Sequence, residues 1–297
     1  MGVVRLHADQ VLLVDAGLDP DRARRVMRDL DGEGLVARAL LLTHSHADHI
    51  GGAATLRRRC PLLVAAPSIE AGFIRAPSLE PFYLFGGAAA PRPLTGKFLQ
   101  AEGCVVDVEV EPGPWRVHEG MAGTLRLELL DLAGHSPGQV GLAVRGACGD
   151  EGPVIYCGDA VFPDDVWHKH GFVYFADVPA SLDTVTHLRA LGPAVLVAGH
   201  GVADGRERVD ALLTTNFEGL EAATESVAAA LSGCAEGLTT EDVLTALTEH
   251  LGANVTSPTE FYLARATVQA HLARLEATGR AVMHVDRGRL LWVAGTP

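Results

Sequence analysis

Long hydrophobic runs are missing from this chain. In its 297 residues no apolar stretch approaches the roughly 20 residues that a membrane helix needs. The first residues, VVRLHADQVLLVD, alternate in polarity and include Asp9, so they lack the basic start and long apolar core of a signal peptide. We therefore expect a cytoplasmic protein that has no membrane partner.

Paired cysteines are missing as well. The chain has five cysteines, an odd number, and no two of them are spaced as Cys-x-x-Cys. Such a pattern argues against a disulfide framework and against a Cys-x-x-Cys redox or zinc site. We expect the five to be reduced, mostly packed thiols in a reducing compartment.

Basic residues are few, and lysine is nearly absent, since only Lys97 and Lys169 occur. Acidic residues outnumber basic ones by 37 to 24, which gives a formal net charge of −13. A surface of this charge repels phosphate backbones, so we expect no nucleic-acid partner. The 48% hydrophobic and 21% charged residues are typical of a globular protein with a buried core, and the length allows one large domain with a small one.

What the chain does contain is a series of short apolar segments, each ending at a turn or a histidine. Seven of them are predicted to be buried strands: residues 11–17, 39–46, 62–67, 125–135, 140–144, 154–159 and 194–200. A helix is predicted over 19–30, where Asp19 precedes Pro20 at the first helical position. Strands that alternate with helices indicate an α/β layered architecture. Four of the strands run into a His or Asp at their carboxyl ends, the edge where α/β proteins place their sites.

The pattern changes after about residue 205. An amphipathic connecting helix is predicted over 206–234. Two further helices, 239–252 and 257–279, each open with a capping box, and the turn Asp-Arg-Gly predicts a hairpin over 281–295. Helix, helix and hairpin is the order of a winged-helix module. We therefore divide the chain into a catalytic domain (1–205), the connecting helix (206–234) and a winged-helix-like domain (235–297).

The segment 43–52, THSHADHIGG, carries the strongest chemical signal. In an extended segment His44 and His46, two residues apart, project the same way, while Asp48 and His49 turn away on the following loop. One short segment can therefore offer two ligands to one metal ion and two to a second ion about 4 Å away. The two glycines that follow allow the next helix to approach closely.

This segment resembles the first metal motif of the metallo-β-lactamase superfamily, and the rest of that family's set follows in order. LAGHSPGQVG supplies His135, VIYCGDAVF supplies Asp159 and VLVAGHG supplies His200. By this resemblance one metal would be held by His44, His46 and His135 and the other by Asp48, His49 and His200, with Asp159 as the bridge. The resemblance covers about residues 3–205 and implies the αββα sandwich of that family. Members usually have a strand upstream of the one that leads to Asp15, whereas this chain starts almost at that strand, so we expect a shortened sheet edge or a displaced start site.

The ligand set implies two zinc ions, with iron as the rival metal because persulfide dioxygenases resemble the chain at the THxHADH segment. Two such ions bind a shared water and lower its pKa from about 16 to about 7, which provides hydroxide at neutral pH. We expect Asp48 to be catalytic, orienting this nucleophile and passing on its proton. No G-x-S-x-G motif lies near the site, so serine catalysis is not indicated. The chemistry fits hydrolysis of an ester, thioester, lactone or lactam.

The 16 aromatic residues are scarce but clustered. The stretch 70–105, rich in Pro and Gly, is predicted to be mostly loop and contains several of them. Two segments that would border the cleft are candidates for substrate binding: Phe82, Tyr83 and Phe85 in the first, and Trp167, His168 and His170 in the second. They favour an apolar substrate, although they could equally pack the loops. With so few basic residues, a glutathione thioester is not expected.

Several functions remain open beside an ester or thioester hydrolase for a small-molecule acyl substrate. A zinc-dependent aromatic polyketide cyclase or thioesterase would act on a chain bound to a carrier protein. A β-lactamase-fold nuclease could carry such a C-terminal domain, but residues 235–297 contain five arginines against seven acidic residues and lack a basic face. A DNA-binding regulator would not need the intact metal set. The C-terminal domain could instead pack over the cleft or form a homodimer.

Six further histidines have no context that suggests a ligand. We assign them to the surface or to packing: His7, His118, His187, His250, His271 and His284.

Overall fold

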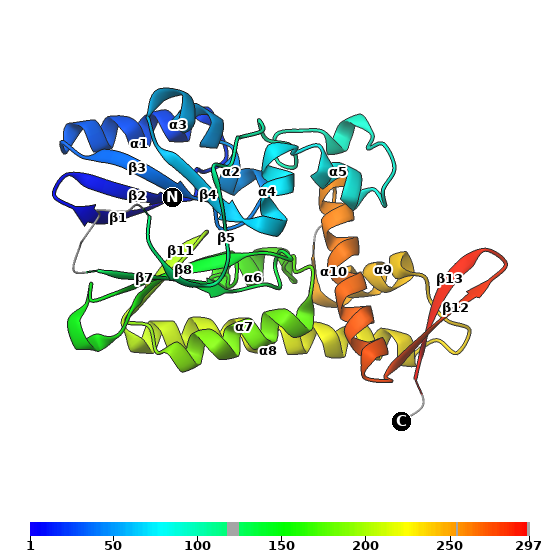
Figure 1. Ribbon diagram of the computed structural model, residues 1–297. Coiled ribbons are helices and arrows are strands. Elements are labelled where there is room, and N and C mark those ends of the chain that lie inside the picture. Colours follow the sequence, from blue (N-terminus) through cyan, green and yellow to red (C-terminus); the bar gives the residue numbers. More distant parts are fainter. Residues whose placement is uncertain (118–124, 254, 296–297) are drawn as a thin grey trace.

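The computed structural model describes residues 1–117, 125–253 and 255–295 (Figure 1). His118 lies outside this part. Two β-sheets face each other in the middle of the larger domain, and a layer of helices covers the outer face of each sheet. The architecture is therefore the expected four-layer α/β arrangement with two mixed sheets.

The first sheet contains five strands in chain order. They are β1 (Gly2–His7), β2 (Gln10–Val14), β3 (Val36–Leu41), β4 (Leu63–Pro67) and β5 (Val108–Val110). The β1–β2 pair is antiparallel, and β2 to β5 run parallel. The crossovers place α1 (Pro20–Gly32) and α3 (Ala53–Arg59) on the outer face (Figure 1). As predicted, Asp19 caps α1, accepting a hydrogen bond of 3.1 Å from the backbone of Arg22.

The expectation that almost nothing precedes the strand leading to Asp15 is wrong. Strand β1 precedes it and pairs with β2 from Gly2 opposite Val14 to His7 opposite Gln10. Its alternation of exposed and buried residues suits an edge strand with one face on the core, and a tight turn at Ala8, with φ of 47°, returns the chain. The alternation of polar and apolar residues that argued against a signal peptide is therefore the pattern of strand β1.

The second sheet contains six strands in the order β11-β10-β9-β8-β7-β6. They are β6 (Gly113–Trp115), β7 (Arg126–Asp131), β8 (Val140–Arg145), β9 (Val154–Gly158), β10 (Val195–Ala198) and β11 (Gly201–Asp204). Only β9 and β10 pair in parallel; the other neighbours are antiparallel. Helices α7 (Val178–Leu191) and α8 (Arg206–Ser232) cover its outer face (Figure 1).

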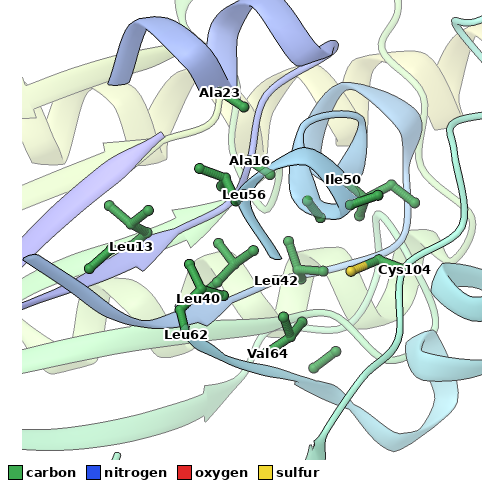
Figure 2. Close-up of a cluster of buried hydrophobic side chains, with 14 of the residues drawn as sticks. Leu13, Ala16, Ala23, Leu40, Leu42, Ile50, Leu56, Leu62, Val64 and Cys104 are labelled. Atoms are coloured by element: carbon green, nitrogen blue, oxygen red, sulfur yellow. The ribbon is translucent and has the colours of Figure 1, made fainter. Parts of the chain in front are cut away.

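Alternate residues of the same strand serve two different cores. In Figure 2, Leu13, Leu40 and Val64 point from the first sheet toward the helix layer and pack with Ile50 and Leu56. Their neighbours Leu12, Leu41 and Ala65 point the other way and pack against strands of the second sheet. Because a strand alternates its faces, a strand buried on both sides has a continuous apolar sequence. This explains why these segments were recognisable in the sequence.

The C-terminal part has the predicted order of elements. The α8 helix is 27 residues long and is followed by α9 (Thr240–Leu251), α10 (Pro258–Ala277), β12 (Ala281–Asp286) and β13 (Arg289–Ala294). Both predicted capping boxes are present, Thr239 with Asp242 and Ser257 with Glu260. The helix, helix, hairpin order is confirmed, while the assignment to the winged-helix class stays a prediction. None of the described helices is long and apolar enough to cross a bilayer.

The stretch 70–105 is mostly loop, as expected, but it also contains short helices. It contains the end of α4 (Ser68–Arg75), then α5 (Leu79–Leu84) and the short 3-10 helix η1 (Arg92–Leu94). Helix α10 packs against this region, with the rings of Phe85 and Tyr262 centred 5.5 Å apart (Figure 1). A six-residue helix cannot be stable alone, and its contact with α10 comes from a distant part of the sequence. The Pro and Gly content of the stretch therefore indicated its loops but not its short helices.

Candidate metal centre

Four loops meet at one edge of the sandwich and bring all seven predicted ligands together. The loop after β3 carries four of them, and the loops after β7, β9 and β10 carry one each. Within each of two groups the donor atoms lie within 4.8 Å of one another: His44, His46 and His135 in the first, and Asp48, His49, Asp159 and His200 in the second. We call these the first and second donor groups.

The glycines that end the first motif have the role expected of them. A side chain on Gly51 would meet the carbonyl oxygen of Leu18 at 1.9 Å, and one on Gly52 would meet that of Ala16 at 2.4 Å. The short helix α2 (Ala47–Ile50), which carries Asp48 and His49, is thus held directly against the loop after β2. Only glycine permits this approach.

The donor atoms fit metal ions of the zinc type. Among the described residues, His44 Nε2 and Asp159 Oδ1 are buried without a hydrogen-bond partner, an arrangement that is costly unless another group satisfies it. His46 Nδ1 lies only 2.8 Å from His135 Nε2, so both rings direct a nitrogen to the same point. Imidazole nitrogens with carboxylate oxygens are ligands that zinc accepts, and two groups linked by Asp159 suit a binuclear centre.

The outer nitrogen of each buried histidine has a fixed partner. His44 Nδ1 lies 3.0 Å from Thr43 Oγ1, and His49 Nδ1 lies 2.8 Å from Asp15 Oδ2. In both rings this leaves Nε2 facing the centre. Hydrogen bonds of this kind fix the orientation and tautomer of a metal-ligating imidazole.

The other two rings of the first donor group are held in opposite senses. His135 Nδ1 lies 2.9 Å from the backbone carbonyl of Tyr174, which turns Nε2 inward. His46 instead directs Nδ1 inward and Nε2 toward the buried Glu80, with 3.7 Å between Nε2 and Oε1. Glu80 comes from α5, so the inserted stretch contributes a carboxylate beside the centre.

Asp15 was not predicted to be a site residue, although its strand was recognised. Its buried carboxylate accepts hydrogen bonds from the backbone of Thr43 at 2.8 Å and from the Thr43 hydroxyl at 3.0 Å, and it also contacts His49. Its φ of 60° lies in the left-handed region, which is uncommon outside glycine. The clue in the sequence was an Asp directly after an apolar strand, the same pattern that identified Asp159.

Glu70 is a second residue that the sequence analysis missed. It is fully buried on α4 and accepts hydrogen bonds from the backbone of Ser45 at 3.0 Å and of Gly138 at 2.8 Å. The hydroxyls of Ser45 and Ser136 also donate to it. One carboxylate therefore joins the loop that holds His44 to the loop that holds His135. Nothing in the segment SIEAGF distinguishes this Glu from one on a solvent-exposed helix.

Burial and neighbouring charges set the protonation of the centre. Burial lowers the pKa of His44 well below its usual range and that of His135 to about 3, and nearby imidazoles act in the same direction. Burial alone would raise the pKa of Asp159, but His49, His200 and His135 hold it well below its usual range. In the first donor group, His44 and His135 are thus neutral, the form that binds a metal ion. In the second, burial alone would lower the pKa of His49, but Asp159 and Asp15 raise it well above its usual range, and the hydrogen bond with Asp159 raises the pKa of His200. Metal binding there would therefore release protons.

The predicted substrate residues are spread over different surroundings. Phe82 and Tyr83 are about half exposed on α5, whereas Phe85 packs on Tyr262. Tyr83 lies near Tyr174, which influences its pKa, and the Tyr174 ring is centred 5.6 Å from that of His46. Of the α5 aromatics, Tyr83 is therefore the one connected to the surroundings of the first donor group.

The second predicted segment forms α6 (Asp164–His170). The Trp167 indole donates to Asn216 at 3.1 Å and packs on α8, so its observed contacts are structural. His168 lies on the same helix and is exposed. His170 ends this helix and is also exposed; partial burial and the neighbouring Lys169 lower its pKa. Substrate binding by these residues stays a prediction.

Comparison with known proteins gives consistent matches. Residues 1–200 match the family model of the metallo-beta-lactamase superfamily. A hydroxyacylglutathione hydrolase of Cupriavidus taiwanensis is 35% identical over 149 residues, which are 50% of this chain and 45% of that protein. One of Nitrobacter winogradskyi is 27% identical over 213 residues, 71% of this chain and 67% of that protein. The first match therefore spans less than half of the relative's length.

Two solved structures share the fold over nearly the whole chain. A metallo-beta-lactamase family protein from Thermus thermophilus aligns with a TM-score of 0.69 and 24% identity, covering 98% of this chain and 92% of the other. A beta-lactamase domain protein from Burkholderia ambifaria aligns with a TM-score of 0.68 and 19% identity, covering 99% and 86%. Both alignments must include the C-terminal helices and hairpin, so this combination of parts also occurs elsewhere.

Proposed function

The chain belongs to the metallo-β-lactamase superfamily, and from this premise we propose that it is a binuclear zinc-dependent hydrolase of thioesters. The observation that carries the proposal is the meeting of seven donor residues in two groups. Two buried atoms among them, His44 Nε2 and Asp159 Oδ1, make no hydrogen bond, although Asp159 Oδ1 lies 3.1 Å from His49 Nε2. The thioester part is supported by the relatives, whose names state the hydrolysis of an acylglutathione.

In this proposal the first donor group holds one ion, the second holds the other, and Asp159 contributes to both. Two zinc ions, when bound, lower the pKa of a shared water to about 7 and polarise a carbonyl. The chain's own part is to hold the donors rigid, through Asp15 behind His49 and Glu70 between two ligand loops.

Asp48 is the residue to which we assign the proton transfer. Its side chain is 41% exposed, while the other carboxylate of the second donor group, Asp159, is buried. One Asp48 oxygen lies 3.5 Å from His200 Nε2, within the second donor group, which leaves the other oxygen available to accept a proton from the attacking water. Asp48 can then pass this proton to the departing thiolate, so no second acid is needed.

The test is metal analysis together with thioester turnover by the full chain. We expect close to two zinc ions per chain, thiol release from acyl thioesters, loss of both on chelation and recovery on addition of zinc. A purified colourless protein with two zinc ions that cleaves esters or lactams but no thioester would contradict the thioester assignment. Iron in the purified protein would instead support the rival metal.

The acyl part of the substrate is a separate question. The exposed Phe82 and Tyr83 rings favour an apolar acyl group, and a polyketide chain on a carrier protein is also a thioester. A series of thioesters with acyl chains from acetyl to aromatic tests both ideas in one assay. A steep rise in kcat/KM with apolar length supports an apolar acyl site, and a flat series contradicts it.

A further inference from the structure

A cavity of about 430 Å³ opens beside the second donor group, on the side of helix α1. It is within the size range of small-molecule sites. One wall contains Asp48, His49 and His200, and the opposite wall is formed by the loop after β2 and the first turns of α1. We call this space the α1 cavity. It lies on a different side of the centre from the predicted aromatic segments, none of whose residues lines it.

Each carboxylate that lines the α1 cavity already has a partner or a role. Asp15 is hydrogen-bonded to Thr43 and contacts His49, Asp19 caps α1, and Asp21 pairs with Arg24. Asp48 belongs to the second donor group. Among the described residues, none of these carboxylates forms a salt bridge with the two arginines that line the same cavity.

The α1 cavity is also lined by two arginines, and neither has a charged partner among the described residues. Arg22 and Arg25 both line it, three residues apart on α1 and so on one face of the helix. Within the described ranges neither guanidinium has a salt bridge, whereas the neighbouring Arg24 does. Both residues are exposed to solvent, so their guanidinium groups are available to an anion that enters the cavity.

We propose that Arg22 and Arg25 bind a carboxylate on the thiol part of the substrate, an inference that rests on the proposed thioesterase function. A guanidinium presents paired N–H donors that match the two oxygens of a carboxylate. Because the rest of the surface repels anions, such a substrate needs a local cationic site beside the metal ions. The small number of basic residues in the chain argued against a peptide-like thiol as part of the substrate. Arg22 and Arg25 answer that objection, because both line the cavity beside the second donor group.

The experiment compares two thioesters that differ only in charge, an S-acyl N-acetylcysteine and its carboxamide. The variant is Arg22→Gln/Arg25→Gln, which removes both charges and keeps most of each side-chain stem, including the part of Arg22 that packs beside Gly17. We expect kcat/KM on the acid to fall at least tenfold and kcat/KM on the amide to stay within twofold. The matched control is Arg28→Gln on the same helix, outside the α1 cavity, which should change neither value.

A second measurement separates this inference from the proposed function. Binding of S-methylglutathione, which bears carboxylates but has no bond to cleave, is measured by calorimetry on the zinc-loaded chain. Tenfold weaker binding by the double variant supports the arginine site even if no thioester is cleaved, in which case only the proposed function fails. Equal losses on acid and amide, or unchanged binding, overturn the inference. An RNA oligonucleotide is the last probe. If the unchanged protein cleaves it and the double variant does not, while the ratio of kcat/KM on the acid to kcat/KM on the amide is the same in both, the inference is overturned in favour of a phosphodiester substrate.

Discussion

The orientation of the buried imidazoles His49 and His135 is decided by the hydrogen bond on their outer side. Asp15 behind His49 and the Tyr174 carbonyl behind His135 turn Nε2 toward the centre, while His46 directs Nδ1 there. These outer partners come from residues far away along the chain. The ligands therefore depend on the whole fold, even though four of them are within six residues of one another.

Removing Asp159 should destroy the centre, because its carboxylate belongs to the second donor group and also lies beside His135 of the first. His135 Nε2 lies 3.7 Å from its Oδ2 and His200 Nε2 lies 3.2 Å from the same oxygen. We expect Asp159→Ala to lose metal and to reduce the rate at least a hundredfold, measured by metal analysis and thiol release. His284→Ala, on the distant hairpin, is the control, and a similar loss there would show that the ligand assignment is wrong.

Asp15 allows a milder test of the same centre. Asp15→Asn keeps the size and tolerates the left-handed backbone, but it weakens the acceptor behind His49. We expect metal affinity of the second donor group to fall by roughly tenfold to a hundredfold. The measurement is metal retention against a graded chelator. Loss of both ions at the same chelator concentration as in the unchanged protein would contradict this positioning role.

The ligands could be predicted from the sequence because their spacing is local, but the residues that support them could not. The motif at 43–52 and each strand-end histidine are visible in a few letters of sequence. Glu70 and Glu80 act on loops that the fold alone brings near them, and both are carboxylates that a sequence places on the surface by default. Burial of a charged side chain depends on partners from elsewhere in the chain.

Among the elements, α4 has the largest effect on the centre through Glu70. Glu70→Ala would leave the buried backbone N–H groups of Ser45 and Gly138 without an acceptor, at roughly 1–3 kcal/mol each. We expect the free energy of unfolding to fall by about 3 kcal/mol and metal retention to fall with it. The control is Glu109→Ala, whose exposed pair with Arg75 should contribute less than about 1 kcal/mol. Equal effects of the two variants would refute the bracing role of Glu70.

The α5 element shows why the substrate segment was the least predictable part. Its aromatic residues were expected to border the cleft as candidates for substrate binding, but Phe85 packs on Tyr262 of α10, while Tyr83 lies near Tyr174. Helix α5 is too short to show a periodic pattern, and its position depends on α10, about 180 residues later in the chain. The strands were predictable because burial on both faces makes their sequence continuously apolar.

For the whole molecule, α8 joins the two parts. Its first half packs on the second sheet through Val209 and Leu213, and its second half packs in the C-terminal core through Val227 and Leu231. At 27 residues it spans about 40 Å. The same helix thus belongs to both hydrophobic cores, which agrees with its prediction as a connecting helix. Stability of the C-terminal part should therefore depend on groups buried against α8.

His271 is such a group, and it makes the joined molecule sensitive to acid. It is buried on α10, with Nδ1 2.9 Å from Thr224 Oγ1 on α8, as expected of a packing histidine. Burial lowers its pKa to about 4, and Arg274 acts in the same direction. In the unfolded chain the same group takes up a proton near pH 6.5. Between these two values the unfolded state binds the extra proton, so stability is lost as the pH falls from about 6.5 to about 4.

The size of this effect follows from the two pKa values. Between pH 7 and pH 5, His271 should cost the folded protein about 2 kcal/mol of stability. His271→Gln should therefore be the less stable protein at pH 7, where it loses a well-packed ring, yet its free energy of unfolding should decline less toward pH 5. Urea unfolding of both proteins at pH 7, 6 and 5 measures the difference, and acid loss of metal affects both alike. His284→Gln, exposed on the hairpin, should leave the pH dependence unchanged; parallel curves for His271→Gln and the unchanged protein would show that His271 is not the acid-sensitive group.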